Sequence, residues 1–524
     1  MNFKEKKYLK VGRADELSRT KEVYLYRFFE ILPGFLAWLT LLGVVFFSWY
    51  SPVGVAFFII FFYVYWLLKT LYLFIHLRSS YNKMKESMEV DWFQNLKSEF
   101  SNNWGEYYHL LILPTYKESI ETIRETFNAV VNSDYPKDKI IAVLATEERE
   151  GEEAKKRSDI IKKEFSGYFY KFLITVHSDG LEGEIKAKGA NCTWAAREVK
   201  KKIIDPLGVD YKKIIVSCFD IDTRPYPKYF SCLTYHYLKA KNPSRSAFQP
   251  VPVYNNNIWQ ASALSRVVAT SGTFWQMMQQ QRPERLSTFS SQAHSFKALV
   301  EVDFWPTNIV SEDSRIFWQN LLYYDGDYKA IPLNYPVSMD ANLASNFLKT
   351  SLNIYRQQRR WGWGVENIPY ILFGFWKDAL NKKKLTFRQK FHWTWIQLEG
   401  FWSWATNALL IFLLGWLPLA LGGTEFNNTV IAYHLPRITR FLMTLAMLGL
   451  VSSAIYSTLL LPKKPKEYGF LKRLGMLVQW ILIPFTILIF GAIPGLEAQT
   501  RLMLGKYMGF WVTPKEKAGK RYIK

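Results

Sequence analysis

Residues 108–118 read YHLLILPTYKE, an apolar run of strand length that ends in a proline and a polar cluster. Such a run is typical of a strand that is buried inside a sheet. A helical stretch follows at 119–131. Three further apolar runs of this kind come later, at 140–145, 172–177 and 214–219. Strands that alternate with helices predict an α/β, Rossmann-like domain with a mostly parallel sheet, which we expect over residues 106–345.

Two apolar segments precede this domain. Residues 31–50 are long enough for one membrane span. Residues 53–75 form a second stretch that only Lys69 interrupts, near its end, where a lysine can reach the membrane surface. Ser51-Pro52 predicts a tight turn between them, so we expect a transmembrane hairpin over residues 31–77.

The remaining parts of the chain differ in composition. Residues 1–30 are basic and lack an apolar core followed by a cleavage site, so we expect no removable signal peptide. Residues 78–105 are polar and predict a helical linker. Residues 346–400 are aromatic, charged and interrupted, which favours helices along a membrane surface. We expect a transmembrane region at 401–496 and a basic tail at 497–524.

The C-terminal transmembrane region contains three long apolar segments, at 401–421, 441–461 and 474–496. The last of them holds Pro484 and Pro494, which predict a helix that is kinked or only partly inserted. If all three crossed, the tail would lie outside the cell, although basic tails favour the cytosolic side. We therefore expect 474–496 to be re-entrant or interfacial.

Composition narrows the class of protein. The net charge is +22 and aromatic residues make up 17% of the chain, yet the mean hydropathy is only -0.08. An integral membrane protein with one large soluble domain fits these values, and we expect that domain on the cytosolic side of a plasma or inner membrane. Many charges flank apolar segments, which points to membrane lipids and diphosphates rather than nucleic acid. Three cysteines without a C-x-x-C pair argue against a disulfide scaffold or a zinc site.

Polar clusters follow the predicted strands, where ligands of open α/β sheets bind. Asp220 and Asp222 come after the third of the later runs, and Glu147 follows the first. Alternating carboxylates after a strand can hold Mg²⁺ or Mn²⁺ together with a diphosphate. The alternative for the D-x-D is a turn with two solvated carboxylates.

Two further motifs fit the same chemistry. Asp313, in Ser311-Glu312-Asp313, could act as a general base, although a serine before two acidic residues is also an ordinary helix N-cap. Lys188 lies in a basic loop that enters a predicted helix and could contact phosphate oxygens, or it could belong to a solvated turn.

Residues 357–361 read QQRRW, a Q-x-x-R-W pattern at the end of the soluble region. On a helix Gln357, Arg360 and Trp361 share one face. The guanidinium suits a diphosphate, and the indole suits a sugar ring or a base. An amphipathic interfacial helix is the alternative interpretation.

Together these motifs resemble the membrane-bound family-2 glycosyltransferases of the cellulose, chitin and hyaluronan synthase type, over roughly residues 105–365. The resemblance implies a GT-A domain between transmembrane helices. It assigns substrate contacts at the first strand end, near the diphosphate, at the G-T turn of the acceptor terminus and on the Q-x-x-R-W helix. These residues are Thr115, Glu118, Lys188, Ser271, Gly272, Thr273, Gln357 and Trp361. Catalytic roles fall to Asp313, Asp222 and Arg360, and metal binding to Asp220 and Asp222.

One departure and one further match bear on the resemblance. Where the family has an Asp pair that contacts the nucleotide base, this chain has Glu147-Glu148. The resemblance implies a UDP-sugar as donor, and this departure concerns the nucleotide rather than the reaction type. Near the C-terminus, FWVTPK (510–515) matches the F-x-V-T-x-K gating loop of cellulose synthases, which implies donor contacts from Phe510, Thr513 and Lys515.

The resemblance implies an inverting transfer of a sugar from a nucleotide diphosphate sugar to a growing polysaccharide, processively and with translocation. A non-processive enzyme that adds one sugar to a lipid-linked or short acceptor is the first alternative. A channel or transporter with a regulatory domain is the second, and it predicts ionisable residues inside the spans. Only Lys69 and Glu399 come near such positions.

Overall fold

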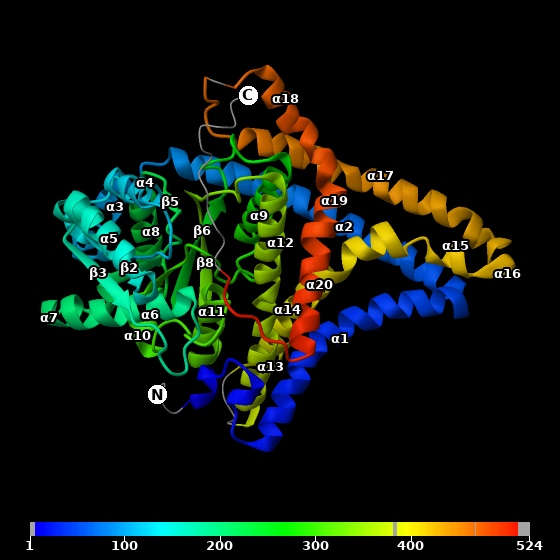
Figure 1. The fold of residues 1–524 in the computed structure, drawn as a ribbon, viewed down its shortest axis with the longest axis horizontal. Coiled ribbons are helices and arrows are strands. Elements are labelled where there is room, and N and C mark those ends of the chain that lie inside the picture. The colour runs from blue at the N-terminus through cyan, green and yellow to red at the C-terminus, as the bar shows by residue number, and fades with distance from the viewer. Residues whose placement is uncertain (1–5, 381–384, 467, 512–524) are drawn as a thin grey trace.

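The computed structural model describes residues 6–380, 385–466 and 468–511, apart from the side chain of residue 450. An α/β domain lies at one end, and a bundle of helices projects from it as an arm (Figure 1). The strands are β1 (Tyr108–Pro114), β2 (Ile140–Glu147), β3 (Lys171–His177), β4 (Ile214–Cys218), β5 (Arg224–Pro225), β6 (Ser246–Val253), β7 (Ala293–Ser295) and β8 (Lys329–Ser338).

The helices before the Q-x-x-R-W segment are α1 (Thr20–Tyr50), α2 (Pro52–Glu89), α3 (Trp92–Glu99), α4 (Ile120–Val131), α5 (Glu152–Phe165), α6 (Lys188–Val199), α7 (Asp205–Leu207), α8 (Tyr229–Lys239), α9 (Ala263–Gln280), α10 (Phe296–Glu301) and α11 (Glu312–Tyr323). Those from that segment onward are α12 (Phe347–Gly362), α13 (Asn367–Leu380), α14 (Phe387–Leu409), α15 (Leu417–Leu421), α16 (Gly423–Asn427), α17 (Val430–Leu459), α18 (Phe470–Val478), α19 (Ile483–Ile487) and α20 (Ile493–Met503).

The eight strands form one sheet in the order β3-β2-β1-β4-β7-β6-β8-β5. β1 to β4 are parallel to one another, and β6 is parallel to β8. β7 runs antiparallel between β4 and β6, and β5 runs antiparallel to β8. The predicted α/β fold with a mostly parallel sheet between apolar helices is therefore confirmed.

The middle of the sheet is buried because its central strands are mostly apolar. Every residue of β2 and β4 is buried, and so are the five central residues of β1. Helices cover both faces, with α6 and α11 over one core and α4 and α8 over the other. This arrangement brings the carboxyl ends of β1, β2 and β4 to the same edge of the sheet.

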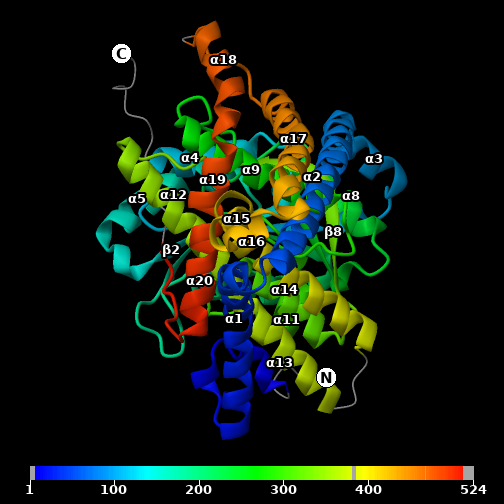
Figure 2. The same cartoon turned by 90° about the vertical axis from the view of Figure 1, so that its right-hand side faces the viewer.

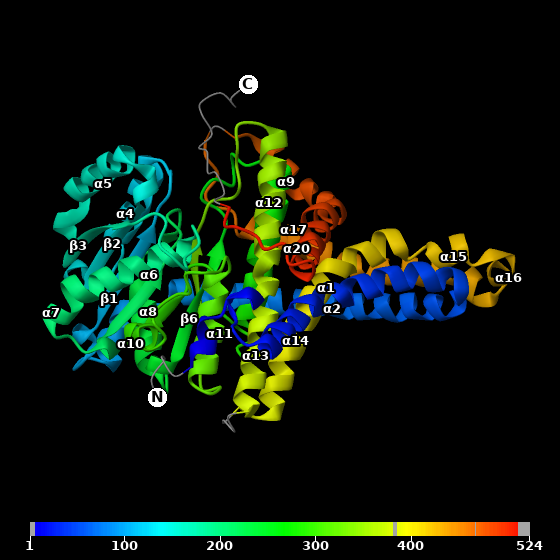
Figure 3. The same ribbon diagram turned by 60° about the horizontal axis from the view of Figure 1, so that its bottom comes forward.

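The arm is formed by α1, α2, the α14–α16 segment and α17, which extend together away from the sheet (Figures 1 and 3). Its core joins Leu41 and Ile59 of the hairpin to Leu410, Ile411 and Leu435. The Tyr63 hydroxyl donates to the Ile411 carbonyl at 2.8 Å. The outer faces of these helices carry many exposed apolar side chains.

Four segments of the described chain are long and apolar enough to cross a membrane: Thr20–Tyr50, Pro52–Glu89, Val430–Leu459 and Phe470–Met503. They indicate a membrane protein. The expected span at 401–421 is absent from this set, since a turn at residues 415–416 separates α14 and its π-helical continuation from the short helix α15. α2 continues to Glu89, so the expected linker begins within a single long helix.

Candidate functional site

Three charged side chains meet at the carboxyl edge of the parallel strands. The Lys188 ammonium lies 2.8 Å from Asp220 Oδ1 and 3.0 Å from Asp313 Oδ2. Asp220 follows β4, Lys188 is the first residue of α6, and Asp313 lies in the first turn of α11. Residues that are up to 125 positions apart in the sequence thus form one cluster.

Lys188 can reach both carboxylates because α6 begins in close contact with the start of α11. A Cβ placed on Gly189 would lie 2.5 Å from the Pro306 carbonyl oxygen and 2.8 Å from Glu312 Cβ. Only glycine fits this approach. Burial opposes the charge on Lys188, but the carboxylates of Asp220 and Asp313 hold the pKa of its ammonium well above the usual range.

The side chains around Asp313 would suit a carboxylate that acts as a general base. Burial raises the pKa of its carboxyl, and Lys188 counteracts part of that rise. Gln292 Nε2 donates to Asp313 Oδ1 at 2.8 Å, and the Thr288 hydroxyl donates to the Asp313 carbonyl at 2.6 Å. These contacts fix the direction of the carboxylate. Ser311 makes no side-chain N-cap bond to α11, so the capping alternative does not explain the motif.

Asp220 and Asp222 hold different positions. Asp220 Oδ2 accepts a hydrogen bond from the Ser290 hydroxyl at 2.7 Å, and its side chain is 30% exposed. Asp222 is buried, and its Oδ2 accepts from the Asp340 backbone N–H at 3.1 Å. Their oxygens are the hard donors that Mg²⁺ or Mn²⁺ prefers. Within the described residues, no group of three or more His, Cys, Asp or Glu side chains forms a ready metal site.

The loop after β1 folds back on itself. Glu118 Oε2 accepts from the Thr115 hydroxyl at 2.9 Å and from the Tyr116 backbone N–H. Lys117 adopts a positive φ of 64° to allow this turn. Thr115 and Glu118 therefore shape the loop, beside the cluster but bonded to each other.

Glu147, at the end of β2, pairs with Arg149. The Arg149 guanidinium lies 4.0 Å from the Tyr116 ring centroid. The Glu147–Arg149 pair lies at one side of a hollow. The hollow is lined by Glu147, Arg149, His177, Ser178, Asp179, Gly180, Leu181, Glu184, Ile185 and Lys186. An acidic and a basic side chain next to an aromatic ring provide hydrogen-bond partners and a flat surface for a nucleobase.

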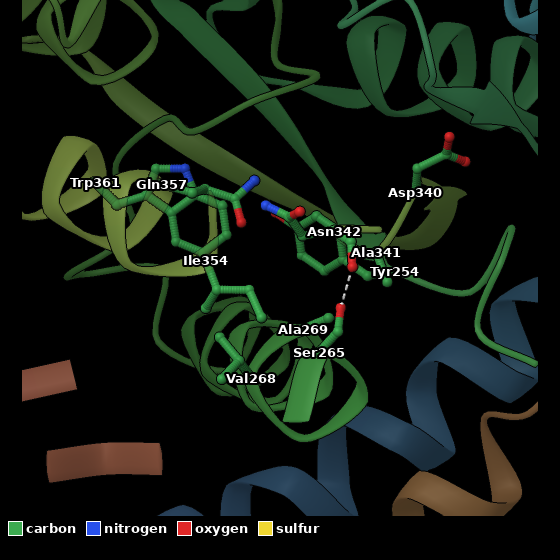
Figure 4. Close-up of a pocket in the computed structure, with 10 residues that line it drawn as sticks. All are labelled: Tyr254, Ser265, Val268, Ala269, Asp340, Ala341, Asn342, Ile354, Gln357 and Trp361. Carbon is green, nitrogen blue, oxygen red and sulfur yellow. Dashed lines mark hydrogen bonds between the residues drawn. The ribbon is translucent and has the colours of Figure 1, made fainter. Parts of the chain in front are cut away.

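The Q-x-x-R-W residues lie on the last turns of α12, as the helical interpretation predicted. Gln357 and Trp361 face a pocket between α12, α9 and the end of the sheet (Figure 4). The pocket is lined by Tyr254, Ser265, Val268, Ala269, Asp340, Ala341, Asn342, Ile354, Gln357 and Trp361. The Tyr254 and Trp361 rings lie 6.1 Å apart, so an aromatic corner and several amide groups border one space.

Ser271, Gly272 and Thr273 form no turn, contrary to expectation, because they lie inside the helix α9. The Ser271 hydroxyl donates back to the Val267 carbonyl, and the Thr273 hydroxyl accepts from the Tyr254 backbone N–H. A Cβ on Gly272 would lie 3.6 Å from Tyr254 and 3.8 Å from Trp361. This glycine therefore faces the aromatic corner.

Arg360 lies outside the lining of this pocket, and its positive charge opposes part of the rise that burial causes in the pKa of the Glu312 carboxyl. Its guanidinium lies 5.0 Å from the Phe510 ring centroid, so the start of the F-x-V-T-x-K match touches the Q-x-x-R-W helix. Thr513 and Lys515 lie outside the described residues. The neighbouring Arg359 pairs instead with Glu497 of α20, at 2.7 Å.

Sequence patterns did not identify Glu366, which connects these motifs. Glu366 Oε1 accepts from the Val310 and Ser311 backbone N–H groups and from the Ser311 hydroxyl, at 2.7–3.1 Å. Its Oε2 accepts from Trp363 Nε1 at 2.8 Å. This buried carboxylate fixes the loop before Asp313 to the end of the Q-x-x-R-W helix. The sequence offered one signal for Glu366, its place five residues after Trp361 in W-G-W-G-V-E.

No family model matches the chain, and no curated protein matches its sequence. Among solved structures, the mannosyltransferase PcManGT from Pyrobaculum calidifontis, in complex with GDP-Man and Mn²⁺, has 14% identity and a TM-score of 0.40 over 74% of this chain and 98% of its own. TarS from S. aureus, in complex with UDP-GlcNAc, has 11% identity and a TM-score of 0.35 over 72% and 91%. Similarity at this level does not establish a common activity.

Proposed function

We propose that this protein is a membrane-bound inverting glycosyltransferase that uses a nucleotide diphosphate sugar. The observation that carries the proposal is the cluster of Lys188, Asp220 and Asp313, with the positive charge of Arg360 acting on the neighbouring Glu312. A carboxylate base and two fixed cations are the groups that such a transfer needs in one place.

In the proposed reaction, the acceptor hydroxyl attacks the anomeric carbon of the donor sugar while Asp313 accepts the hydroxyl proton. The bond from the anomeric carbon to the diphosphate oxygen breaks, and the diphosphate leaves. Lys188 and Arg360 stabilise the negative charge that develops on it. One displacement at the anomeric carbon inverts its configuration. Trp361 and Tyr254 provide the aromatic surface for the acceptor sugar.

Asp220 and Asp222 are the residues that would hold Mg²⁺ or Mn²⁺. Such an ion would supply further positive charge to the donor diphosphate. The fit is supported by their oxygen chemistry and by the exposed side of Asp220. Lys188 lies on the other side of the same carboxylate, so it can balance the charge of Asp220 before the ion arrives.

The acceptor is a growing polysaccharide or a single lipid-linked sugar. The match at Phe510 favours the polysaccharide, because that loop belongs to processive synthases. Val268 and Ile354 at the bottom of the pocket favour a lipid-linked acceptor, because they offer no partner to sugar hydroxyls. Product length, read on a gel after incubation with donor, distinguishes the two.

Direct binding tests the donor class. Purified protein in detergent should bind a nucleotide diphosphate sugar in titration calorimetry, with UDP- and GDP-sugars as the first ligands. The Glu147–Arg149 pair can serve uracil or guanine, so both bases belong in the set. Failure to bind any nucleotide sugar would contradict the proposed function.

We further propose that the arm crosses the membrane and that Phe470–Met503 lies along its cytosolic surface. The α18–α20 column crosses the base of the arm instead of running along it (Figures 1 and 2). α18 exposes Phe470 and Leu471 at 72% and 80%. This topology places the catalytic domain and the segment after α20 on the same side, which removes the conflict noted for the basic tail.

Cysteine labelling checks this topology. Lys506→Cys, after α20, should react with a membrane-impermeant maleimide only in permeabilised cells. Asn428→Cys, at the tip of the arm, should react in intact cells. Both positions are exposed, and the three native cysteines are buried. Labelling of residue 506 in intact cells would show that Phe470–Met503 crosses the membrane.

Donor binding should also depend on pH through Glu312. Burial and the neighbouring Asp313 charge raise the pKa of the Glu312 carboxyl to about 8, although Lys188 and Arg360 lower it. Glu312 is therefore mostly neutral at pH 7 and ionises as the pH rises through about 8. The added negative charge beside the diphosphate should weaken donor binding several-fold between pH 7 and 9. Glu312→Gln should flatten this alkaline decline in calorimetric Kd, and a decline that persists in the variant would exclude Glu312 as its cause.

A further inference from the structure

We propose that the N-terminal segment, residues 10–30, belongs to the donor site because it fixes the chain after α20 against Arg360. We call residues 504–511 the strap. The hydrogen bond between Tyr507 and Glu30 joins the strap to α1. This inference rests on the proposed glycosyl transfer and adds a positioning role for both residues, neither of which belongs to a motif.

The strap touches two parts of the candidate site. Phe510 stacks on the Arg360 guanidinium, and Trp511 lies 5.7 Å from that of Arg356, one turn earlier on α12. Met508 is buried in a cluster with Val310 and Trp363. The strap thus bridges the Q-x-x-R-W helix and the loop that leads to Asp313. Movement of the strap would remove the aromatic ring that fixes the direction of Arg360.

A buried acidic side chain holds the strap at its start. Glu30 is only 1% exposed, and its two oxygens accept from the Tyr507 hydroxyl at 2.9 and 3.1 Å. Arg27 donates to Glu30 at 2.6 Å and also to the carbonyls of Leu502 and Met503. Arg13 lies over the Tyr507 ring at 4.8 Å. Hydrogen bonds to a buried charge are among the stronger ones in proteins.

The same N-terminal segment is attached to the helix of the proposed base. The Arg315 guanidinium of α11 donates to the Val11 carbonyl at 3.3 Å, and Asn308 Nδ2 donates to Glu16 at 2.8 Å. A Cβ on Gly12 would lie 2.9 Å from Asn308, so the two segments are in close contact. Residues 10–30 therefore hold α11 on one side and the strap on the other.

The competing interpretation is that Glu30 only fastens α1 to α20, which would affect stability alone. The two interpretations differ in kinetics. If the Tyr507–Glu30 bond holds the strap closed, its loss lowers the fraction of protein that is competent to bind donor, and the apparent donor KM rises. Saturating donor restores the closed state, so kcat changes little. A purely structural bond would lower the melting temperature and leave the donor KM unchanged.

The test is Tyr507→Phe, which removes one oxygen and keeps the ring under Arg13. We expect the donor KM to rise about tenfold, with kcat within about twofold and the acceptor KM unchanged. Tyr237→Phe is the matched control. Tyr237 lies on α8, away from the strap, and its buried hydroxyl donates to the Lys212 carbonyl. It should leave every kinetic constant within about twofold.

Limited proteolysis supplies a readout that needs no activity. Lys506 is exposed within the strap, and tryptic cleavage there should be about tenfold faster in Tyr507→Phe than in the wild type or in Tyr237→Phe. Equal cleavage rates and an unchanged donor KM would overturn the inference. If the wild-type protein itself transfers no sugar, the proposed function fails, and the cleavage rates still decide whether the bond holds the strap.

Discussion

Asp313→Asn should reduce turnover by at least about 100-fold while donor binding remains, because general-base contributions are typically of that size or larger. The amide keeps the shape of the side chain and can still accept from Gln292, but it cannot take a proton from the acceptor. The ion pair with Lys188 is also lost, so Kd for the donor should be measured beside kcat.

Asp327→Asn is the control for this substitution. Asp327 is exposed and pairs with Arg245 far from the cluster, so its loss should leave kcat within about twofold. If Asp313→Asn retained near-normal turnover with donor bound, another group would be the base. Glu312 lies beside Asp313 but would not replace it at pH 7, because its raised pKa keeps the carboxyl mostly protonated there.

Removal of divalent cations should abolish transfer. Excess EDTA is expected to lower activity to background, and Mg²⁺ or Mn²⁺ should restore it, because Asp220 and Asp222 alone would leave the diphosphate beside two negative charges. Asp220→Asn should lower the apparent metal affinity at least about tenfold in the same assay. Asp205→Asn, which removes a surface carboxylate paired with Lys200, is the matched control.

Full activity in excess EDTA would show that the two aspartates serve another purpose. Lys188 would then supply the positive charge at Asp220 throughout the reaction. The distinction matters because the ammonium already lies 2.8 Å from Asp220 in this structure.

Much of the fold and part of the site followed from local patterns. The buried strands were recognisable as apolar runs of strand length, and the rule that ligands bind beyond strand ends marked Asp220 as a candidate. Lys188 and Asp313 were recognisable from their own short motifs. The helical period put Gln357 and Trp361 on one side of the same helix. These features depend on residues that are close in the sequence.

The rest depends on contacts between distant residues, which local patterns do not contain. β7 has only three residues, too few for a recognisable strand, yet Gln292 just before it orients Asp313. Glu366 and Glu30 act through buried hydrogen bonds to segments more than 50 and 470 residues away, respectively. Gly272 suggested a turn, but it lies in a helix where a small residue faces Tyr254 and Trp361.

The central claim is that the Lys188–Asp220–Asp313 cluster transfers a sugar from a nucleotide diphosphate donor. The most direct test incubates purified protein, with its membrane lipids, with a panel of nucleotide sugars and measures released nucleoside diphosphate. We predict release from a donor of one sugar type, reduced at least about 100-fold in Asp313→Asn and unchanged in Asp327→Asn. Release that is the same in all three proteins, or absent with every donor, would contradict the account.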